Sequence, residues 1–195
     1  MFIAFEGLDG SGSSTQSKLL SEKLENEGFS TFLTKEPTSH HFIGQLIREV
    51  LQHKRNVDPK TLQLLFTADR SEHLKNDIEP ALAEGKIVIS DRYLLSTIAF
   101  GALDCDMNWL MDLNKPFLMP DITFLSKLEA DICIQRIQAR GTQFELFEKK
   151  EKLEKIWKHY EILAQKFPNV QIIDTSDTIE AVAEKIWEIA KKSNS

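Results

Sequence analysis

Residues 2–16 read FIAFEGLDGSGSSTQ, and this stretch decides how the rest of the chain is interpreted. Its apolar start is followed by a turn with Gly7, Gly10 and Gly12, and a helical pattern begins at Ser13. Glycines let several backbone N–H groups point at one anion, and the N-terminus of a following helix adds positive charge. The stretch therefore predicts a strand, a phosphate-binding loop and a helix, in that order.

One position of this loop departs from the usual phosphate-binding pattern. The pattern G-x-x-x-x-G-K-[ST] is matched by Gly7, Gly12 and Ser14, whereas Ser13 stands where the pattern has lysine. The same residues could form an ordinary strand-to-helix turn. The loop alone leaves both interpretations open, and the rest of the chain has to decide between them.

The composition is that of a soluble globular protein. Of the 195 residues, 42% are hydrophobic and 28% are charged, and we expect a single domain over residues 1–195. The apolar runs are too short to span a bilayer, and the N-terminus does not look like a secretory signal, so we expect a cytoplasmic protein without a membrane partner. The net charge of −6 argues against a nucleic-acid partner bound through a broad basic surface, but not against a small basic nucleotide pocket.

Cysteine and histidine positions predict no disulfide framework and no metal site. Cys105 and Cys133 do not follow C-x-x-C spacing, which suits a reducing compartment, and the five histidines have no metal-ligand spacing. We expect the cysteines to be structural and the histidines to be surface or hydrogen-bonded side chains.

Apolar runs of strand length alternate with helical patterns along the chain. The strands are predicted over residues 1–5, 29–34, 87–90, 121–126 and 170–174. The helices are predicted over residues 15–27, 39–53, 58–75, 77–84, 93–103, 108–114, 129–140, 148–166 and 178–191. Strands that are each followed by helices predict an α/β protein, a doubly wound three-layer sandwich around a five-stranded parallel sheet.

Polar residues follow three of the predicted strands directly. These are the Gly7 loop, the pair Glu36-Pro37 and the pair Asp91-Arg92. Ligands of such sheets bind beyond the carboxyl ends of the strands, so we expect the three segments to converge on one crevice. An arginine there suits bidentate phosphate binding, and a carboxylate can hold Mg²⁺ or its waters. Without the other motifs, a structural ion pair between Asp91 and Arg92 is an equally good interpretation.

The segment LLFTADRSEH, residues 64–73, carries Phe66 and Arg70 one helical turn apart. An aromatic ring and a guanidinium on the same helix face can stack on a nucleobase and bind its edge. The pattern alone favours a simpler interpretation, in which Phe66 packs in the core and Arg70 is a surface charge.

Six segments together carry a resemblance that covers nearly the whole chain. FEGLDGSGSSTQ, TKEP, LLFTADRSEH, DRYLLSTIAFGA, PDITFL and RIQARG occur in this order and at separations that resemble the thymidylate kinase family. Single motifs are shared with other nucleoside monophosphate kinases, but the ordered set is specific. The resemblance implies a P-loop NTPase fold and Mg²⁺-dependent phosphoryl transfer from ATP to dTMP, giving dTDP and ADP. It also implies a cytosolic homodimer that serves deoxynucleotide synthesis.

The resemblance also implies roles for individual residues. The ATP phosphates would lie on the loop residues Gly7, Leu8, Asp9, Gly10, Ser11, Gly12, Ser13, Ser14 and Thr15. The dTMP site would consist of Asp9, Glu36, Pro37, Phe66, Arg70, Arg92, Ser96, Thr97 and Phe100. Within it, Phe66 would stack on thymine, Arg70 would bind the carbonyl edge of the base, and Arg92 would bind the phosphate. The bulky ring of Phe100 would disfavour a ribose 2′-hydroxyl.

For the metal and the lid, the resemblance implies Ser14 and Asp91 near Mg²⁺ and a lid over residues 141–147. Arg140 would stack on adenine, and Arg136 would reach the phosphates, although a solvated helix arginine is an equal interpretation of Arg136. Because the phosphate oxygen of dTMP is already ionised, catalysis needs positioning and charge neutralisation and no general base.

Three departures from the family pattern stand out. Ser13 removes the lysine of the loop, Phe100-Gly101 replaces the usual Tyr-Gln of bacterial members, and the lid segment is short and weakly basic. The cations that could replace the lysine are Lys35, Arg136, Arg140 and Lys149, and the sequence does not choose among them. Two alternatives to a dTMP kinase stay open at this point, a kinase with relaxed acceptor choice and a catalytically weak nucleotide-binding paralogue.

Overall fold

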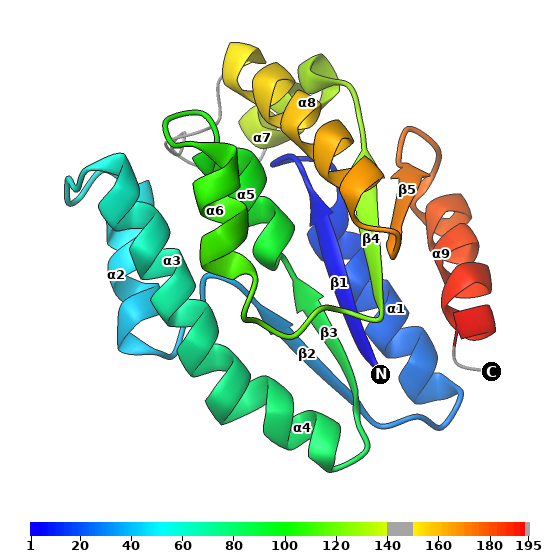
Figure 1. Cartoon of the computed structure of the whole chain (residues 1–195). Coiled ribbons are helices and arrows are strands. Elements are labelled where there is room, and N and C mark those ends of the chain that lie inside the picture. Colours follow the sequence, from blue (N-terminus) through cyan, green and yellow to red (C-terminus); the bar gives the residue numbers. More distant parts are fainter. Residues whose placement is uncertain (140–149, 194–195) are drawn as a thin grey trace.

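A five-stranded parallel sheet forms the centre of the computed structural model, which describes residues 1–139 and 150–193 (Figure 1). The strands of this described part are β1 (Phe2–Gly7), β2 (Thr31–Lys35), β3 (Ile87–Asp91), β4 (Ile122–Lys127) and β5 (Val170–Asp174). Their order across the sheet is β2-β3-β1-β4-β5, and all neighbours run parallel. The predicted doubly wound α/β fold is confirmed.

Helices cover both faces of the sheet. In the described ranges they are α1 (Ser13–Asn26), α2 (Phe42–Leu51), α3 (Pro59–His73), α4 (Glu79–Ala83), α5 (Leu94–Gly101), α6 (Met107–Asn114), α7 (Ala130–Ala139), α8 (Lys150–Lys166) and α9 (Ile179–Ser193). Figure 1 shows α1 and α9 on one face, and α5 and α8 on the other. None of the helices described is both long and apolar enough to cross a membrane.

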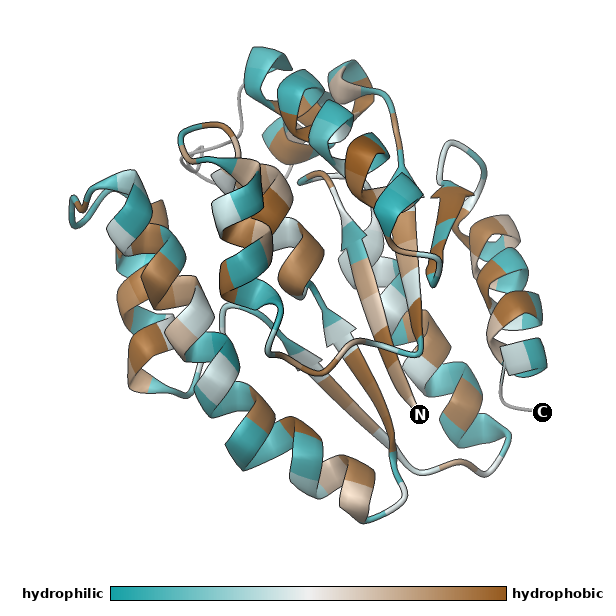
Figure 2. Cartoon of the chain, viewed as in Figure 1, coloured by the Kyte–Doolittle hydropathy of each residue, from teal (hydrophilic) through white to brown (hydrophobic). Residues whose placement is uncertain are grey.

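The sheet has a hydrophobic core on each face because its three central strands, β3, β1 and β4, are buried on both sides, whereas the edge strands β2 and β5 are partly exposed. In β1, Phe2 and Ala4 join the cluster under α5 and α8, whereas Ile3 and Phe5 join the cluster under α1 and α9. The central strands accordingly appear brown in Figure 2, while the outer helices alternate between brown and teal. This alternation sets which residues of each strand face which helix layer.

The chain between residues 58 and 84 differs from the sequence prediction of two separate helices. A π-helical turn, η1 (Leu74–Ile78), joins α3 to α4 without a break. Pro80 lies at the start of α4 and has no N–H to donate, and a wider turn just before it accommodates the missing hydrogen bond. The helix predicted over residues 39–53 is also shorter, because His41 has an extended backbone and α2 begins at Phe42.

The register of the sheet brings three strand ends together. Asp91, the last residue of β3, pairs with Phe5 of β1 on one side and with Lys35 of β2 on the other. Neighbouring strands lie about 4.8 Å apart, so groups that follow these residues share one edge of the sheet. The loop after β1 starts at that edge, and it forms the floor of the site.

Candidate active site

Close packing against its surroundings determines the shape of the loop after β1. Gly10 has a φ of +85°, and a Cβ atom there would lie 2.6 Å from the carbonyl oxygen of Cys133 in α7. Gly7 has a φ of +150°, and its Cβ atom would lie 2.6 Å from the Oγ of Ser11. Side chains are therefore excluded at both positions. The loop backbone stays bare, as phosphate binding through N–H groups requires.

The loop leads directly into the N-terminus of α1. Gly12 is the N-cap of this helix and offers no side-chain acceptor to its first amides. Those N–H groups and the helix dipole form an anion site. The opposite side of the loop is held by Thr175, whose hydroxyl donates to the carbonyl of Ser11 over 2.8 Å.

Asp91 gathers two hydroxyls and a cation at this helix terminus. Its carboxylate accepts hydrogen bonds from Ser14 Oγ at 2.5 Å, from Ser13 Oγ at 3.5 Å and from Lys35 Nζ at 2.6 Å. Burial alone would raise the pKa of this carboxyl, but the nearby charges of Lys35 and Arg92 hold the pKa below its ordinary value. Asp91 is therefore ionised at neutral pH. A carboxylate and a hydroxyl beside a phosphate loop are the oxygen donors that Mg²⁺ prefers.

Arg92 lies between the loop and α5. It pairs with Asp9, donates to the carbonyl of Gly7 at 3.0 Å and to Ser96 Oγ at 3.1 Å, and lies 5.1 Å above the ring of Phe100. Burial lowers the pKa of the guanidinium, but the Asp9 carboxylate outweighs this and raises the pKa, so Arg92 stays charged. Its backbone has a φ of +74°, which is unusual for a residue with a side chain.

Beneath Arg92 lies a buried network that the sequence did not reveal. The hydroxyl of Ser96 donates to the Glu6 carboxylate and lies 2.9 Å from the Tyr160 hydroxyl. Burial raises the pKa of Glu6 to about 7, although the hydrogen bond from Ser96 and the charge of Arg92 oppose this. The Ser96 hydroxyl already has hydrogen-bond partners in this network. The predicted contact between Ser96 and a nucleobase stays a prediction. A charged residue, Glu6, next to the end of an otherwise apolar strand was the available signal.

Arg70 is buried completely, so the interpretation of this residue as a surface charge is wrong. Its guanidinium donates to Glu36 at 2.6 Å, to Thr97 at 2.8 Å and to Asn114, and it lies 4.9 Å above the ring of Tyr93. The Nε atom of Arg70 is buried and has no hydrogen-bond partner. Buried donors are normally paired, so this unsatisfied donor marks the cluster as unusual.

The remaining predicted site residues lie around this cluster. Phe66 stands one turn before Arg70 on α3 and is partly buried against the core. Pro37 is buried, and its carbonyl accepts a hydrogen bond of 2.5 Å from Arg48. Gln63, which the sequence analysis did not single out, fills the space beside Gly101, and its buried Oε1 atom has no partner.

The predicted lid falls largely outside the described residues. Arg140, Lys149 and residues 141–147 are not among them. Arg136 is described: it is exposed on α7, and its Nη1 atom lies 3.4 Å from the carbonyl oxygen of Gly10. Arg136 therefore touches the loop, and its contact with the ATP phosphates stays a prediction.

The structure also gathers a histidine cluster that sequence spacing could not reveal. Nε2 of His41 and Nε2 of His40 lie 2.6 and 3.1 Å from one oxygen of Asp77, and all three could hold a metal ion. Both rings are hydrogen-bonded to Asp77, as expected of surface or hydrogen-bonded histidines. Asp77 lies on the π-helical turn η1, far from the histidines in sequence, which is why no spacing rule could detect the group.

Comparisons with known proteins agree with this geometry. The family model described as thymidylate kinase matches residues 5–186. A protein named "Probable thymidylate kinase" from Pyrococcus horikoshii is 40% identical over 196 residues, which cover 97% of this chain and 95% of that protein. Proteins of the same name from Thermococcus kodakarensis and Methanocaldococcus jannaschii are each 41% identical, and the matches cover 95% of this chain and 95% and 93% of those proteins. The resemblance drawn from the ordered motifs is confirmed, and the chain belongs to the thymidylate kinase family.

Proposed function

We propose that this protein transfers the γ-phosphoryl group of ATP to dTMP, giving dTDP and ADP. The observation that carries the proposal is the pair of arginines on either side of α5. Arg92 faces the phosphate loop through Asp9, and Arg70 is buried beside Thr97 with an unpaired donor. One arginine suits the phosphate of a nucleotide and the other suits its base.

The reaction requires no proton transfer by the protein. An ionised oxygen of the dTMP phosphate forms a bond to the γ-phosphorus, and the bond from that phosphorus to the β,γ-bridging oxygen breaks. The bridging oxygen leaves with ADP and carries the released negative charge. Arg92 holds the attacking phosphate, Asp9 orients Arg92, and the loop amides of residues 7–15 hold the ATP phosphates.

The donor set beside the loop fits Mg²⁺ as the cofactor that accompanies ATP. The hydroxyl of Ser14 and the ionised carboxylate of Asp91 would hold the ion or its waters. When bound, Mg²⁺ neutralises phosphate charge. Phe66, Arg70 and the residues of the buried cluster would orient the acceptor nucleotide.

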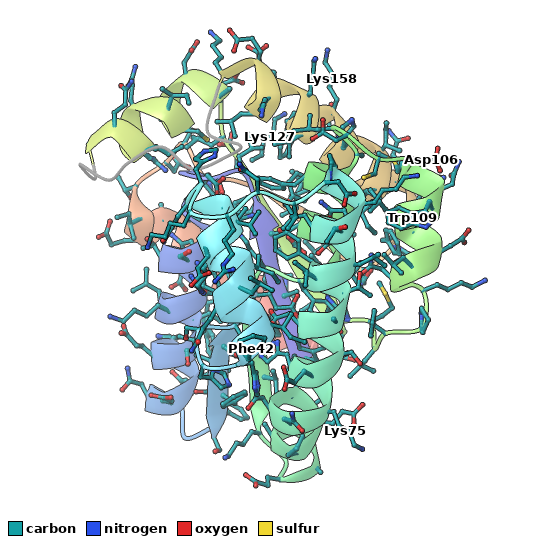
Figure 3. The ribbon with its side chains drawn as sticks, turned by 90° about the vertical axis from the view of Figure 1, so that its left-hand side faces the viewer. Phe42, Lys75, Asp106, Trp109, Lys127 and Lys158 are labelled. Carbon is teal, nitrogen blue, oxygen red and sulfur yellow. The ribbon has the colours of Figure 1, made fainter. Side chains whose placement is uncertain are left out.

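We further propose that residues 1–195 form one kinase domain that acts as a cytoplasmic homodimer in dTTP synthesis. Support for a dimer comes from apolar side chains on α2 and α3, which pack on each other. Phe42 is 77% exposed and Leu64 is 49% exposed, and Figure 3 looks onto these helices. Sedimentation velocity of the native chain and of Phe42→Glu tests this proposal. A native monomer would contradict it.

Steady-state ADP formation with dTMP, dUMP, dGMP, dCMP and dAMP tests the acceptor. We expect the highest kcat/KM with dTMP. A different preferred acceptor would support a kinase with shifted or relaxed choice, and no ADP formation with any acceptor would support a non-catalytic paralogue. The family comparisons favour neither alternative.

Arg92→Ala tests the acceptor side of the site. Removal of a charged phosphate contact costs about 2–5 kcal/mol, so we expect dTMP affinity to fall by a large factor while ATP affinity changes little. Arg55→Ala is a matched control, because this exposed arginine pairs only at the surface with Glu49. Isothermal titration with each nucleotide gives the two affinities. An equal loss for ATP and dTMP would reject the assignment of Arg92 to the acceptor.

A further inference from the structure

We propose that Lys35 supplies the positive charge that a lysine at position 13 would supply, and that its ammonium group binds the phosphoryl group during transfer. The proposal rests on the kinase activity proposed above. It identifies a catalytic residue outside the loop, contributed by a neighbouring strand.

The geometry at the end of β2 carries this inference. Lys35 is the last residue of β2 and pairs in register with Asp91. Its Nζ atom lies 2.6 Å from Asp91 Oδ2 and 3.3 Å from Ser14 Oγ. Ser13, which replaces the loop lysine, contacts the other oxygen of the same carboxylate at 3.5 Å. The ammonium therefore lies at the N-terminus of α1, next to the position that lost its charge.

The other cations near the loop have different tasks. The guanidinium of Arg92 already binds Asp9, Gly7 and Ser96 on the acceptor side. Arg136 approaches from α7 and donates to the carbonyl of Gly10. Of the substitutes considered from the sequence that the structure describes, Lys35 is the one that reaches the Ser14 hydroxyl.

The side chain of Lys35 is also able to follow a phosphoryl group. It is 45% exposed, whereas the Asp91 side chain that it contacts is 7% exposed. An ammonium group has three N–H donors on a flexible stem, and the two contacts use two of them. A third donor can bind a phosphate oxygen while Asp91 Oδ2 holds the ammonium in place, and Asp91 Oδ1, which accepts from Ser13 at 3.5 Å, is left for Mg²⁺ or its waters.

In the proposed reaction, the Lys35 ammonium lies beside the phosphoryl group whose negative charge changes during transfer. As the bond to the bridging oxygen breaks, negative charge spreads over the transferred phosphoryl group and the departing ADP. The ammonium group of Lys35 acts as a hydrogen-bond donor and transfers no proton. Removal of one such charge-stabilising donor costs roughly a hundred- to a thousandfold in kcat.

The first experiment measures kcat and KM for ATP and dTMP in four variants. They are Lys35→Met, Lys35→Arg, Ser13→Lys and the double variant Lys35→Met with Ser13→Lys. We expect Lys35→Met to lower kcat by roughly a hundred- to a thousandfold with little change in KM for dTMP. Lys35→Arg should keep much more of the activity, and Ser13→Lys should restore kcat in the Lys35→Met background.

Lys75→Met is the matched control. This lysine is 80% exposed and pairs only loosely with Glu79 at 3.7 Å, and Figure 3 shows it at the opposite end of the molecule from Lys127, the last residue of β4. We expect its kcat to equal that of the native chain. An unchanged kcat in Lys35→Met overturns the proposal. So does a loss confined to KM for dTMP, which would make Lys35 an acceptor contact, or a failure of Ser13→Lys to rescue.

A binding measurement keeps the test independent of turnover and of metal. Isothermal titration in EDTA compares ADP with the β,γ-imido analogue of ATP, for chains whose folding is checked by circular dichroism. We expect Lys35→Met to weaken the analogue more than ADP, and Ser13→Lys to reverse this. An equal ratio of affinities in the native chain and Lys35→Met overturns the proposal. A native chain that turns over no acceptor refutes the kinase proposal, and the binding ratio still decides the role of Lys35.

Discussion

Replacement of Glu36 by glutamine should destabilise the protein strongly, although the two side chains have nearly the same shape. The carboxylate of Glu36 is 3% exposed and lies 2.6 Å from Arg70 and 3.1 Å from His73. In Glu36→Gln, the fully buried guanidinium of Arg70 keeps only the neutral partners Thr97 and Asn114. Breaking a buried ion pair on one side costs about 3–5 kcal/mol, because an uncompensated charge is left behind.

Urea unfolding followed by tryptophan fluorescence measures this loss, and the chain contains three tryptophans for the purpose. Glu49→Gln is the control, because Glu49 pairs with Arg55 at the surface, where such a pair contributes at most about 1 kcal/mol. The double variant Glu36→Gln with Arg70→Met should recover part of the loss, since it removes the uncompensated charge. If Glu36→Gln lost no more free energy of unfolding than the control, the buried pair would not be a structural unit.

Two further predictions concern the residues beneath and within the loop. The folded protein holds a proton on Glu6 up to about pH 7, against an ordinary pKa of 4.5, so the native chain should lose unfolding free energy relative to Glu6→Gln as the pH rises through that interval. Urea titrations of both chains at about pH 5 and about pH 8 measure the change, and an equal difference at both pH values would contradict it. Gly10→Ala should weaken ATP binding and cost roughly 1–3 kcal/mol, because a Cβ atom 2.6 Å from the Cys133 carbonyl adds to the strain of a positive φ. Gly85→Ala is the control. Gly85 has a φ of +78°, and no atom lies within 4 Å of the position that an added Cβ would take, so this variant measures the backbone strain alone. Thermal unfolding that shifts equally in both variants would exclude the contact with Cys133.

The layered fold was predictable because hydrophobic pattern and strand ends are local properties of the sequence. Ile87 to Ser90 is a short β-branched run followed by Asp91 and Arg92. Because the carboxyl ends of parallel strands share one edge of the sheet, the pattern alone places Asp91 and Arg92 beside the loop. The continuity of the helix through residues 74–78 was not predictable, because a π-helical turn carries no sequence signature as clear as a cap.

Side-chain partners were harder to predict than strand ends, because they depend on register. Arg70 was visible as one member of a helical pair, but its burial follows from Glu36, which comes from the end of a different strand. Likewise, the sequence exposed the charge deficit at Ser13 and named Lys35 as one of four substitutes. The pairing of Lys35 with Asp91 follows only from the alignment of β2 with β3.

The left-handed backbone of Arg92 lowers the stability of the protein, whereas its side chain serves the proposed function. A φ of +74° costs a residue with a side chain roughly 1–2 kcal/mol relative to glycine. Selection for stability alone would therefore favour Arg92→Gly. The same substitution would remove the guanidinium beside Asp9. An arginine in this conformation therefore carries a stability cost that only a task of its guanidinium can offset.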